Sequence, residues 1–246
     1  MSMYRFGKHP PRQDYRTLRL KKYFTTALAP PPASYDVLDK VCTKLGANDV
    51  GALFPMDAND TLGDCTIAAV AHAITAYCGL VGTKKVMSTQ AVTKLYMHLT
   101  GGVDSGLVEL DVLNHWRQHA VDAEKILAFA ALDIKNHEHV KQAIHLFGGV
   151  YLGFQVQRHC LEDFNARKPW TPAPLTHDGH AVYAVGYDKH GLTVLTWGST
   201  QKATWEWWDE CVDEAYAILP PQAKKADFAP GFDFAQLQSD LQAVAQ

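Results

Sequence analysis

A polar turn that runs directly into an alanine-rich helix constrains the fold of this chain more than any other stretch. The turn covers residues 59–64, and Cys65 follows it as the first residue of the expected helix. Beyond the cysteine, apolar side chains recur every three or four residues, at Ile67, Val70, Ala71, Ile74, Tyr77 and Cys78. This spacing predicts a helix buried in the core, with Gly79 as its end.

A cysteine at the start of a helix has two interpretations. The first N–H groups of a helix lack intrahelical partners and carry the positive end of the helix dipole, so they favour a thiolate over a thiol. A lone cysteine among alanines is also a common small core residue. Cys65 is therefore either a reactive thiol or a packing residue, and the choice depends on whether a base lies beside it.

The composition is that of an ordinary globular chain that can bury a large core. Of its 246 residues, 47% are hydrophobic and six are tryptophans, which suits one domain or two tightly packed lobes. The formal net charge of −3 gives no electrostatic case for binding nucleic acid. No apolar run reaches the roughly 18 residues of a membrane span. Residues 1–11 lack the apolar centre of a secretory signal, which predicts a cytoplasmic protein.

The cysteines argue against two common structural roles. There are five of them, at Cys42, Cys65, Cys78, Cys160 and Cys211. Their number is odd, they are widely spaced, and no C-x-x-C pair occurs, so neither a disulfide framework nor a structural zinc site is expected. The sequence predicts no metal and no cofactor.

Shifts in composition divide the chain into four parts, of which residues 1–45 form an N-terminal arm. The arm carries a basic cluster and a polyproline run at 30–32, which favour extended backbone, with room for a short helix at 35–45. The basic cluster consists of Arg12, Arg16, Arg19, Lys21 and Lys22. A solvated face is the ordinary interpretation of such a cluster, and an arm that docks a partner or inhibits the protein is the alternative.

Helices dominate the second part of the chain and strands the third. In residues 46–149, helical spacing and a capping Ser88 predict helices at 65–79, 91–96, 110–120 and 140–147. In residues 150–219, β-branched and aromatic residues predict strands at 150–156, 181–187, 192–197, 203–208 and 215–219. A hairpin loop at 187–191 predicts antiparallel pairing, so the expected fold class is α+β, with a helical lobe before a β lobe. Residues 220–246 are a tail with a short helix at 234–244.

A catalytic thiol needs a base, and the chain offers twelve histidines. His72 lies seven residues along the helix from Cys65, a rise of about 10 Å, which excludes contact with the sulfur. His137 and His139 flank a glutamate in a polar stretch that lacks the H-E-x-x-H metal pattern. His177 and His180 lie at the junction between a loop and a strand, where a side chain can be presented at the edge of a sheet.

These residues resemble those of the papain-like cysteine peptidases. In that family a base histidine opens a strand that ends in Gly-Tyr, as His180 does in the segment 180–187. The family also has an amide side chain six residues before the nucleophile and a glycine two residues before it, where this chain has Asn59 and Gly63. The family's amide is usually glutamine. The pair Trp197-Gly198 is similar to the family's late Trp-Gly, and the resemblance runs in order from about residue 46 to residue 219.

The resemblance implies a role for each site residue. Cys65 would be the nucleophile and His180 the base, with the Asn59 amide and the Cys65 N–H as the oxyanion hole. It also implies that Gly101, Gly102 and Trp197 line the substrate cleft.

One position departs from the family. Leu195 stands where the triad asparagine is expected, and a leucine cannot orient an imidazole. Thr196 or Asp178 could take that role, or a backbone carbonyl could hold the ring while Trp197 shields it. Asp64 would oppose thiolate formation unless it points to solvent.

Three functions follow from this pattern. The first is a thiol hydrolase that cleaves a peptide or amide bond of a peptide or protein substrate through a Cys65 thioester, with His180 as base. The second is a non-catalytic relative that binds peptides or proteins in the same cleft. The third is an acyltransferase that uses the same cysteine and histidine. The sequence leaves the substrate and the oligomeric state open.

Overall fold

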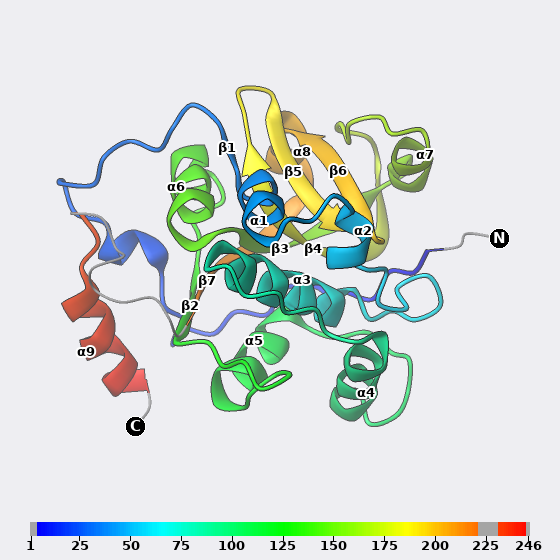
Figure 1. Cartoon of the computed structure of the whole chain (residues 1–246), viewed down its shortest axis with the longest axis horizontal. Helices are drawn as coiled ribbons and strands as arrows, with labels where there is room; N and C mark the ends of the chain where they lie inside the picture. Colours follow the sequence, from blue (N-terminus) through cyan, green and yellow to red (C-terminus); the bar gives the residue numbers. More distant parts are fainter. Residues whose placement is uncertain (1–3, 221–230, 245–246) are drawn as a thin grey trace.

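The computed structural model describes residues 4–220 and 231–244. Its centre is a long helix, α3 (Cys65–Leu80), packed against an antiparallel sheet (Figure 1). Every residue of α3 from Cys65 to Gly79 is buried, because neighbouring elements cover all sides of the helix. The expected α+β class is confirmed.

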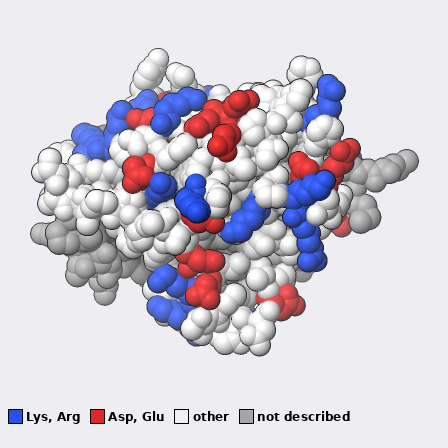
Figure 2. Space-filling model, turned by 90° about the horizontal axis from the view of Figure 1, so that it is seen from above, with Lys and Arg blue, Asp and Glu red and all other residues white. Residues whose placement is uncertain are grey.

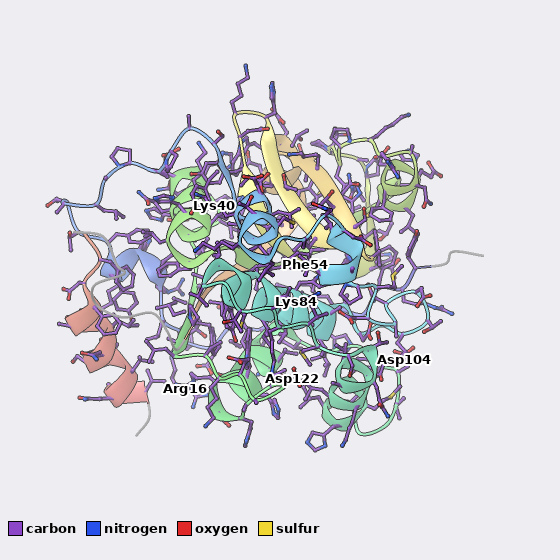
Figure 3. The ribbon with its side chains drawn as sticks, in the orientation of Figure 1. Arg16, Lys40, Phe54, Lys84, Asp104 and Asp122 are labelled. Carbon is purple, nitrogen blue, oxygen red and sulfur yellow. The ribbon has the colours of Figure 1, made fainter. Side chains whose placement is uncertain are left out.

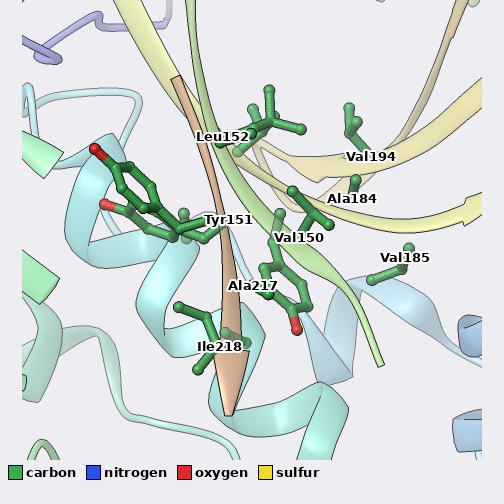
Figure 4. Close-up of a cluster of buried hydrophobic side chains, with 14 of the residues drawn as sticks. Val150, Tyr151, Leu152, Ala184, Val185, Val194, Ala217 and Ile218 are labelled. Carbon is green, nitrogen blue, oxygen red and sulfur yellow. The ribbon is translucent and has the colours of Figure 1, made fainter. Parts of the chain in front are cut away.

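The sheet has the strand order β2-β7-β3-β4-β5-β6, and the short β1 pairs with β4. All of these pairs are antiparallel. The strands are β1 (Tyr35–Asp36), β2 (Ala128–Ala131), β3 (Val150–Gln157), β4 (Leu175–Tyr187), β5 (Gly191–Thr196), β6 (Ser199–Thr204) and β7 (Val212–Leu219). Figure 4 shows Val150, Tyr151, Leu152, Ala217 and Ile218 of β3 and β7 packed in the core beside α3.

Helices cover the two sides of this centre. They are η1 (Leu20–Tyr23), α1 (Val37–Leu45), α2 (Val50–Leu53), α4 (Thr89–Leu99), α5 (Glu109–Gln118), α6 (His137–Phe147), α7 (Cys160–Asn165), α8 (Trp205–Cys211) and α9 (Phe234–Val244). The sequence signals for several ends are confirmed. The Ser88 side chain accepts a hydrogen bond from the N–H of Ala91, and Gly148 ends α6 in the left-handed conformation.

Four predictions about single elements were wrong. The segment 203–208 is not one strand, because Thr204 caps α8, whose first residues are tryptophans. β4 begins at Leu175, because pairing with β3 continues across a bulge beyond Ala181. β2 lies in the part expected to be helical only. Gly79 does not end α3. It lies inside the helix, where a Cβ would come 2.5 Å from Val41 of α1.

The N-terminal arm wraps across the whole molecule before it joins the sheet at β1 (Figure 1). It begins beside the start of α3, passes β2 and forms η1, against which α9 packs. Most of the arm is extended, as predicted. Parts of two predictions, the first residues of the arm and residues 221–230 and 245–246 of the tail, lie outside the described residues.

The charged side chains are mixed in sign over the surface. Figure 2 shows basic and acidic residues interspersed on the face it presents. In the basic cluster, Arg12 pairs with Asp111, Lys21 with Asp133 and Lys22 with Asp240. No helix within the described ranges is long and apolar enough to cross a membrane.

Candidate active site

Cys65 is the first residue of α3, at the junction of the helical lobe and the sheet. The turn before it is tied down, because the N–H of Gly63 donates to Asp104 Oδ1 at 3.0 Å. Asp104 lies in the loop between α4 and α5, at the side of the molecule (Figure 3). The Cys65 side chain is buried. A reactive thiol placed here needs a partner from the sheet.

His180 lies within β4, which packs along α3, and its ring is held on two sides. Its Nε2 lies 2.8 Å from the hydroxyl oxygen of Thr196 on β5. The indole of Trp197 stacks on the ring, with centroids 4.5 Å apart and planes inclined by 19°. Of the partners left open by the sequence, the structure therefore brings Thr196 and Trp197 to the ring.

The other two candidates for that position lie elsewhere. Leu195 is a buried strand residue paired with Tyr183, and Asp178 is exposed and hydrogen-bonded to Thr176. Leu195 points away from the ring because consecutive residues of β5 point to opposite faces of the sheet. Only the residue after Leu195 points toward His180.

The second ring nitrogen of His180 lies one residue from a backbone contact to the cysteine. Nδ1 is buried and has no hydrogen-bond partner, and the next residue, Ala181, contributes a backbone hydrogen bond to the Cys65 thiol. His72 is engaged elsewhere, with its Nε2 3.0 Å from the carbonyl oxygen of Pro55. The structure thus brings Cys65 and His180 to the same place.

Asn59 is also buried beside Cys65, and its amide already has acceptors. It donates to the carbonyl oxygen of Leu62 at 3.1 Å and to that of Arg5 at 3.3 Å. Asp64 does not point to solvent but is fully buried, and burial raises the pKa of its carboxyl to about 8. When ionised, this carboxyl opposes a thiolate at Cys65, because its charge raises the pKa of the thiol.

Residues 4–9 of the arm, here called the plug, run across the front of this site. The Lys8 N–H donates to the Gly179 carbonyl of β4 at 3.1 Å, and the Leu107 N–H donates to the Gly7 carbonyl at 2.8 Å. The N–H of Arg5 donates to the Asn59 carbonyl at 2.9 Å. The plug is therefore hydrogen-bonded to both lobes at once, as an extended peptide in a cleft would be.

Aromatic side chains of the plug cover the histidine. The Phe6 ring meets the His180 ring edge to face at 5.5 Å, and Tyr4 packs on Trp197 at 4.9 Å. Trp197 also contacts Phe164 of α7 at 4.9 Å. These contacts keep water from the imidazole.

Glycines permit the close fit of the plug. A Cβ at position 7 would clash with the backbone carbonyl of Gly63, two residues before Cys65, and one at position 179 would clash with the Lys8 carbonyl. No local pattern predicts this contact, because Gly7 and Lys8 lie in a stretch without periodicity.

With the plug in place, both reacting groups are neutral. Burial raises the pKa of the Cys65 thiol to about 12, although backbone hydrogen bonds from Ala181 and Gly7 act in the opposite direction. Burial lowers the pKa of His180 to about 3. The charged pair of a thiolate and an imidazolium is disfavoured because neither charge reaches water.

The glycines predicted to line the cleft lie at a different place in their loop. Gly101 and Gly102 are exposed and end α4, with the Gly102 N–H bonded to the Met97 carbonyl at 2.7 Å. The same loop meets the plug through Gly106 and Leu107 instead, where a Cβ at position 106 would clash with the Gly7 carbonyl. Trp197 does lie beside the plug, as expected.

A buried cysteine at the start of a central helix, facing a histidine on an antiparallel sheet, is the arrangement of the papain-like cysteine protease fold, and comparison with solved structures shows that fold here. Xylellain, a cysteine protease from Xylella fastidiosa, matches with a TM-score of 0.69 and 17% identity over 90% of this chain and 98% of its own. The proCathepsin B S9 of Trypanosoma congolense matches with a TM-score of 0.59 and 13% identity over 89% and 88% of the two chains.

A ragweed protein extends the comparison. The Amb a 11 cysteine protease, in its proform, matches with a TM-score of 0.60 and 14% identity over 80% of this chain and 69% of its own. No family model and no curated protein sequence matches the chain. The likeness is therefore one of fold.

Proposed function

We propose that this chain is a cysteine peptidase that cleaves a peptide bond through a thioester on Cys65, and that the plug keeps it latent. The observation that carries the proposal is the environment of His180. Thr196 and Trp197 hold the ring, Nε2 is engaged, and Nδ1 is buried without a partner, while the next residue, Ala181, forms a backbone hydrogen bond with the Cys65 thiol.

The chemical steps follow from these positions once the plug leaves. His180 Nδ1 takes the thiol proton, and the start of α3 stabilises the thiolate. The Cys65 sulfur attacks the substrate carbonyl carbon, and the oxyanion accepts hydrogen bonds from the Cys65 N–H and the Asn59 amide. The C–N bond then breaks as His180 returns its proton to the leaving amine. Water, deprotonated by His180, hydrolyses the thioester and frees the thiol.

The plug supports latency because it occupies the atoms that the reaction needs. The Asn59 amide donates to the Arg5 carbonyl, and Phe6 covers His180. The direction of the plug also argues against its own cleavage. A leaving amine must lie on the His180 and Trp197 side, yet that side holds Tyr4 and Phe6, which precede Gly7 in the chain. A substrate bound for cleavage would run the opposite way.

A non-catalytic binding protein is the second candidate. It is favoured by the absence of an amide or carboxylate at the third triad position, where Thr196 supplies only a hydroxyl. Such a protein would use the same cleft to hold an extended peptide without cutting it. The two functions differ in whether Cys65 becomes a thiolate when the cleft is open.

The deciding experiment measures how fast iodoacetamide alkylates Cys65 between pH 4 and pH 10, with the labelled cysteine identified by peptide mapping. It compares the chain carrying Gly7→Ala, which clashes with Gly63 and displaces the plug, with the same chain carrying His180→Ala as well. For a peptidase we expect rapid labelling below pH 7 that the second substitution removes, leaving a titration near the ordinary thiol value of about 8.5. Identical titrations of the two variants would contradict the peptidase proposal and favour the non-catalytic binding protein.

A further inference from the structure

One side chain of the plug enters an acidic pocket beside the candidate site. Among the described residues, Lys8 is the only lysine or arginine that is buried. Its ammonium nitrogen lies 2.9 Å from Asp213 Oδ1 and 3.2 Å from Glu214 Oε1, both on β7. The Lys8 and Glu214 side chains are only 1% and 5% exposed. The lysine is therefore desolvated and held by carboxylates.

A bulge in the sheet turns two consecutive carboxylates toward the lysine. Gly153 of β3 faces Glu214 and Phe154 faces Val212, so Asp213 is an extra residue between two paired positions. In a regular strand Asp213 and Glu214 would point to opposite faces. A bulge of this kind re-aims a side chain and is common beside functional sites.

A third carboxylate and a missing side chain complete the pocket. Glu109, in the first turn of α5, is fully buried, and neither of its oxygens has a hydrogen-bond partner. Gly153 forms the floor. A Cβ there would clash with Lys8 Cε and lie 2.7 Å from Glu109 Oε1, so only glycine leaves room for a long side chain.

The pocket places three carboxyl groups around one lysine, and burial opposes their ionisation. Burial raises the pKa of Glu109 and of Glu214, while the charge of Lys8 lowers both. The three carboxyl groups also act on one another, since Asp213 raises the pKa of each glutamate. When Lys8 leaves, the pocket has to take up protons or another cation.

The pocket has a fixed place relative to the thiol. Lys8 follows Gly7, whose backbone lies at Cys65, and the pocket is on the side away from Trp197. In a substrate whose leaving amine lies near His180, the residues on the amino side of the scissile bond would lie at this pocket.

Resting on the proposed function, we infer that this pocket selects a lysine or arginine side chain in the substrate, at the second residue on the amino side of the scissile bond. The two oxygens of Asp213, at 2.9 and 3.0 Å from the ammonium, also suit the fork of a guanidinium.

The first test replaces residue 8 in the full chain and measures alkylation of Cys65 at pH 7. Lys8→Arg keeps the charge and is expected to stay as slow as the unaltered chain. Lys8→Met keeps the length without the charge, and Lys8→Glu adds an anion to three carboxylates. We expect rates that rise from Lys to Met to Glu, with Glu faster by on the order of 10- to 100-fold. Equal rates for Lys, Met and Glu would overturn the inference, because the pocket would then not select charge.

The second test uses the Lys8→Glu chain as an enzyme. The substrates are fluorogenic amides of the form X-Gly, with X as Arg, Lys, Leu or Glu. In these amides X would take the place of Lys8 in the pocket, and Gly the place of Gly7 at the thiol. We expect Arg and Lys to be cleaved at least about tenfold faster than Leu, and Glu slowest. Glu214→Gln should reduce the preference for Arg, whereas Glu210→Gln, on the exposed side of α8, should leave it unchanged.

The outcomes separate the inference from the proposed function. Cleavage without preference for a basic residue overturns the inference and leaves the peptidase. Failure to cleave any amide overturns the peptidase, while the labelling series at position 8 still decides whether the pocket selects a cation.

Discussion

Two segments of the N-terminal arm, the plug at residues 4–9 and the segment 18–24, are held by different forces. The plug lies in the cleft through backbone hydrogen bonds, aromatic contacts and one buried ammonium. Farther along, at residues 18–24, the side chains of Leu20 and Tyr23 are buried in the core, the backbone bonds to β2, and the Tyr23 hydroxyl donates to Asp240 of α9.

This difference indicates which part of the arm can move. A segment held by apolar burial leaves only when the core opens, so residues 18–24 are part of the fold. The plug is held by backbone hydrogen bonds, an ion pair and the rings of Tyr4 and Phe6, contacts that a substrate in the cleft can replace, which makes local release possible without unfolding. Changes at the two ends should therefore have separate effects, on stability at one end and on access to Cys65 at the other.

The largest effect is expected where the arm joins the core. Leu20→Ala removes a buried side chain and should lower the free energy of unfolding by about 2–5 kcal/mol. Urea unfolding followed by tryptophan fluorescence measures the loss, with Leu175→Ala, a half-exposed position on β4, as the control. A change below about 1 kcal/mol for Leu20→Ala would mean that this end of the arm is as loosely held as the plug.

The next effect is expected at the plug. Gly7→Ala forces a side chain against the Gly63 carbonyl, and overpacking of this kind costs about 1–3 kcal/mol. Local release avoids that cost, so alkylation of Cys65 at pH 7 should rise by on the order of 10- to 100-fold. The urea midpoint should change little. Faster alkylation together with a clearly lower urea midpoint would show that the plug and the core open as one unit.

The fold was more predictable from the sequence than the arm was. The helix after Cys65, the capping Ser88 and the hairpin before Gly191 all depend on local patterns, and the structure has each of them. The strand predicted across Trp205 was wrong because aromatic enrichment does not distinguish a strand from a short buried helix.

The candidate site was predictable only in part. Position in the chain indicated Cys65, His180 and Asn59, and their roles remain predictions. The choice of Thr196 over Asp178 depended on the strand period and register, which the sequence left open. The plug and its acidic pocket come from contacts between residues that are about 100 and 200 positions apart, such as Lys8 with Glu109 and Asp213. No local pattern records contacts of that range.

A pH dependence is expected from Asp64, which is buried and follows Gly63, the residue that Gly7 of the plug contacts. The pKa of this carboxyl is raised to about 8 in the folded chain, so the folded state binds its proton more tightly than the unfolded state does. Stability is therefore lost as pH rises from about 4 to 8. Asp64→Asn should remove roughly 1–2 kcal/mol of the loss between pH 5 and pH 7. Burial also raises the pKa of Asp57, to about 7, so some of the slope should remain.

The measurement is urea unfolding at several pH values, in the unaltered chain and in the chain with Gly7→Ala. If the plug buries Asp64, its displacement should let water reach the carboxyl and weaken the contribution of Asp64 to the slope. If Asp64→Asn changes the pH dependence equally with and without Gly7→Ala, the turn at residues 59–64 buries Asp64 without help from the plug.

The smallest effect is expected at Thr196, and it should be visible only when the plug is displaced. Thr196→Ala removes the hydroxyl 2.8 Å from His180 Nε2, a hydrogen bond worth about 1 kcal/mol, and frees the ring to rotate. In the closed chain both reacting groups are neutral and covered, so alkylation should not respond. With Gly7→Ala present, the rate at pH 6 should fall by about threefold to tenfold, and Thr196→Ser should restore it. The matched control is Thr193→Ala. Thr193 lies on β5, as Thr196 does, and its hydroxyl accepts a hydrogen bond from Lys202 of β6. A fall of equal size in the closed chain would mean that Thr196 acts on the plug instead of on the imidazole. The plug and residues 18–24 would then differ in their effect on stability only.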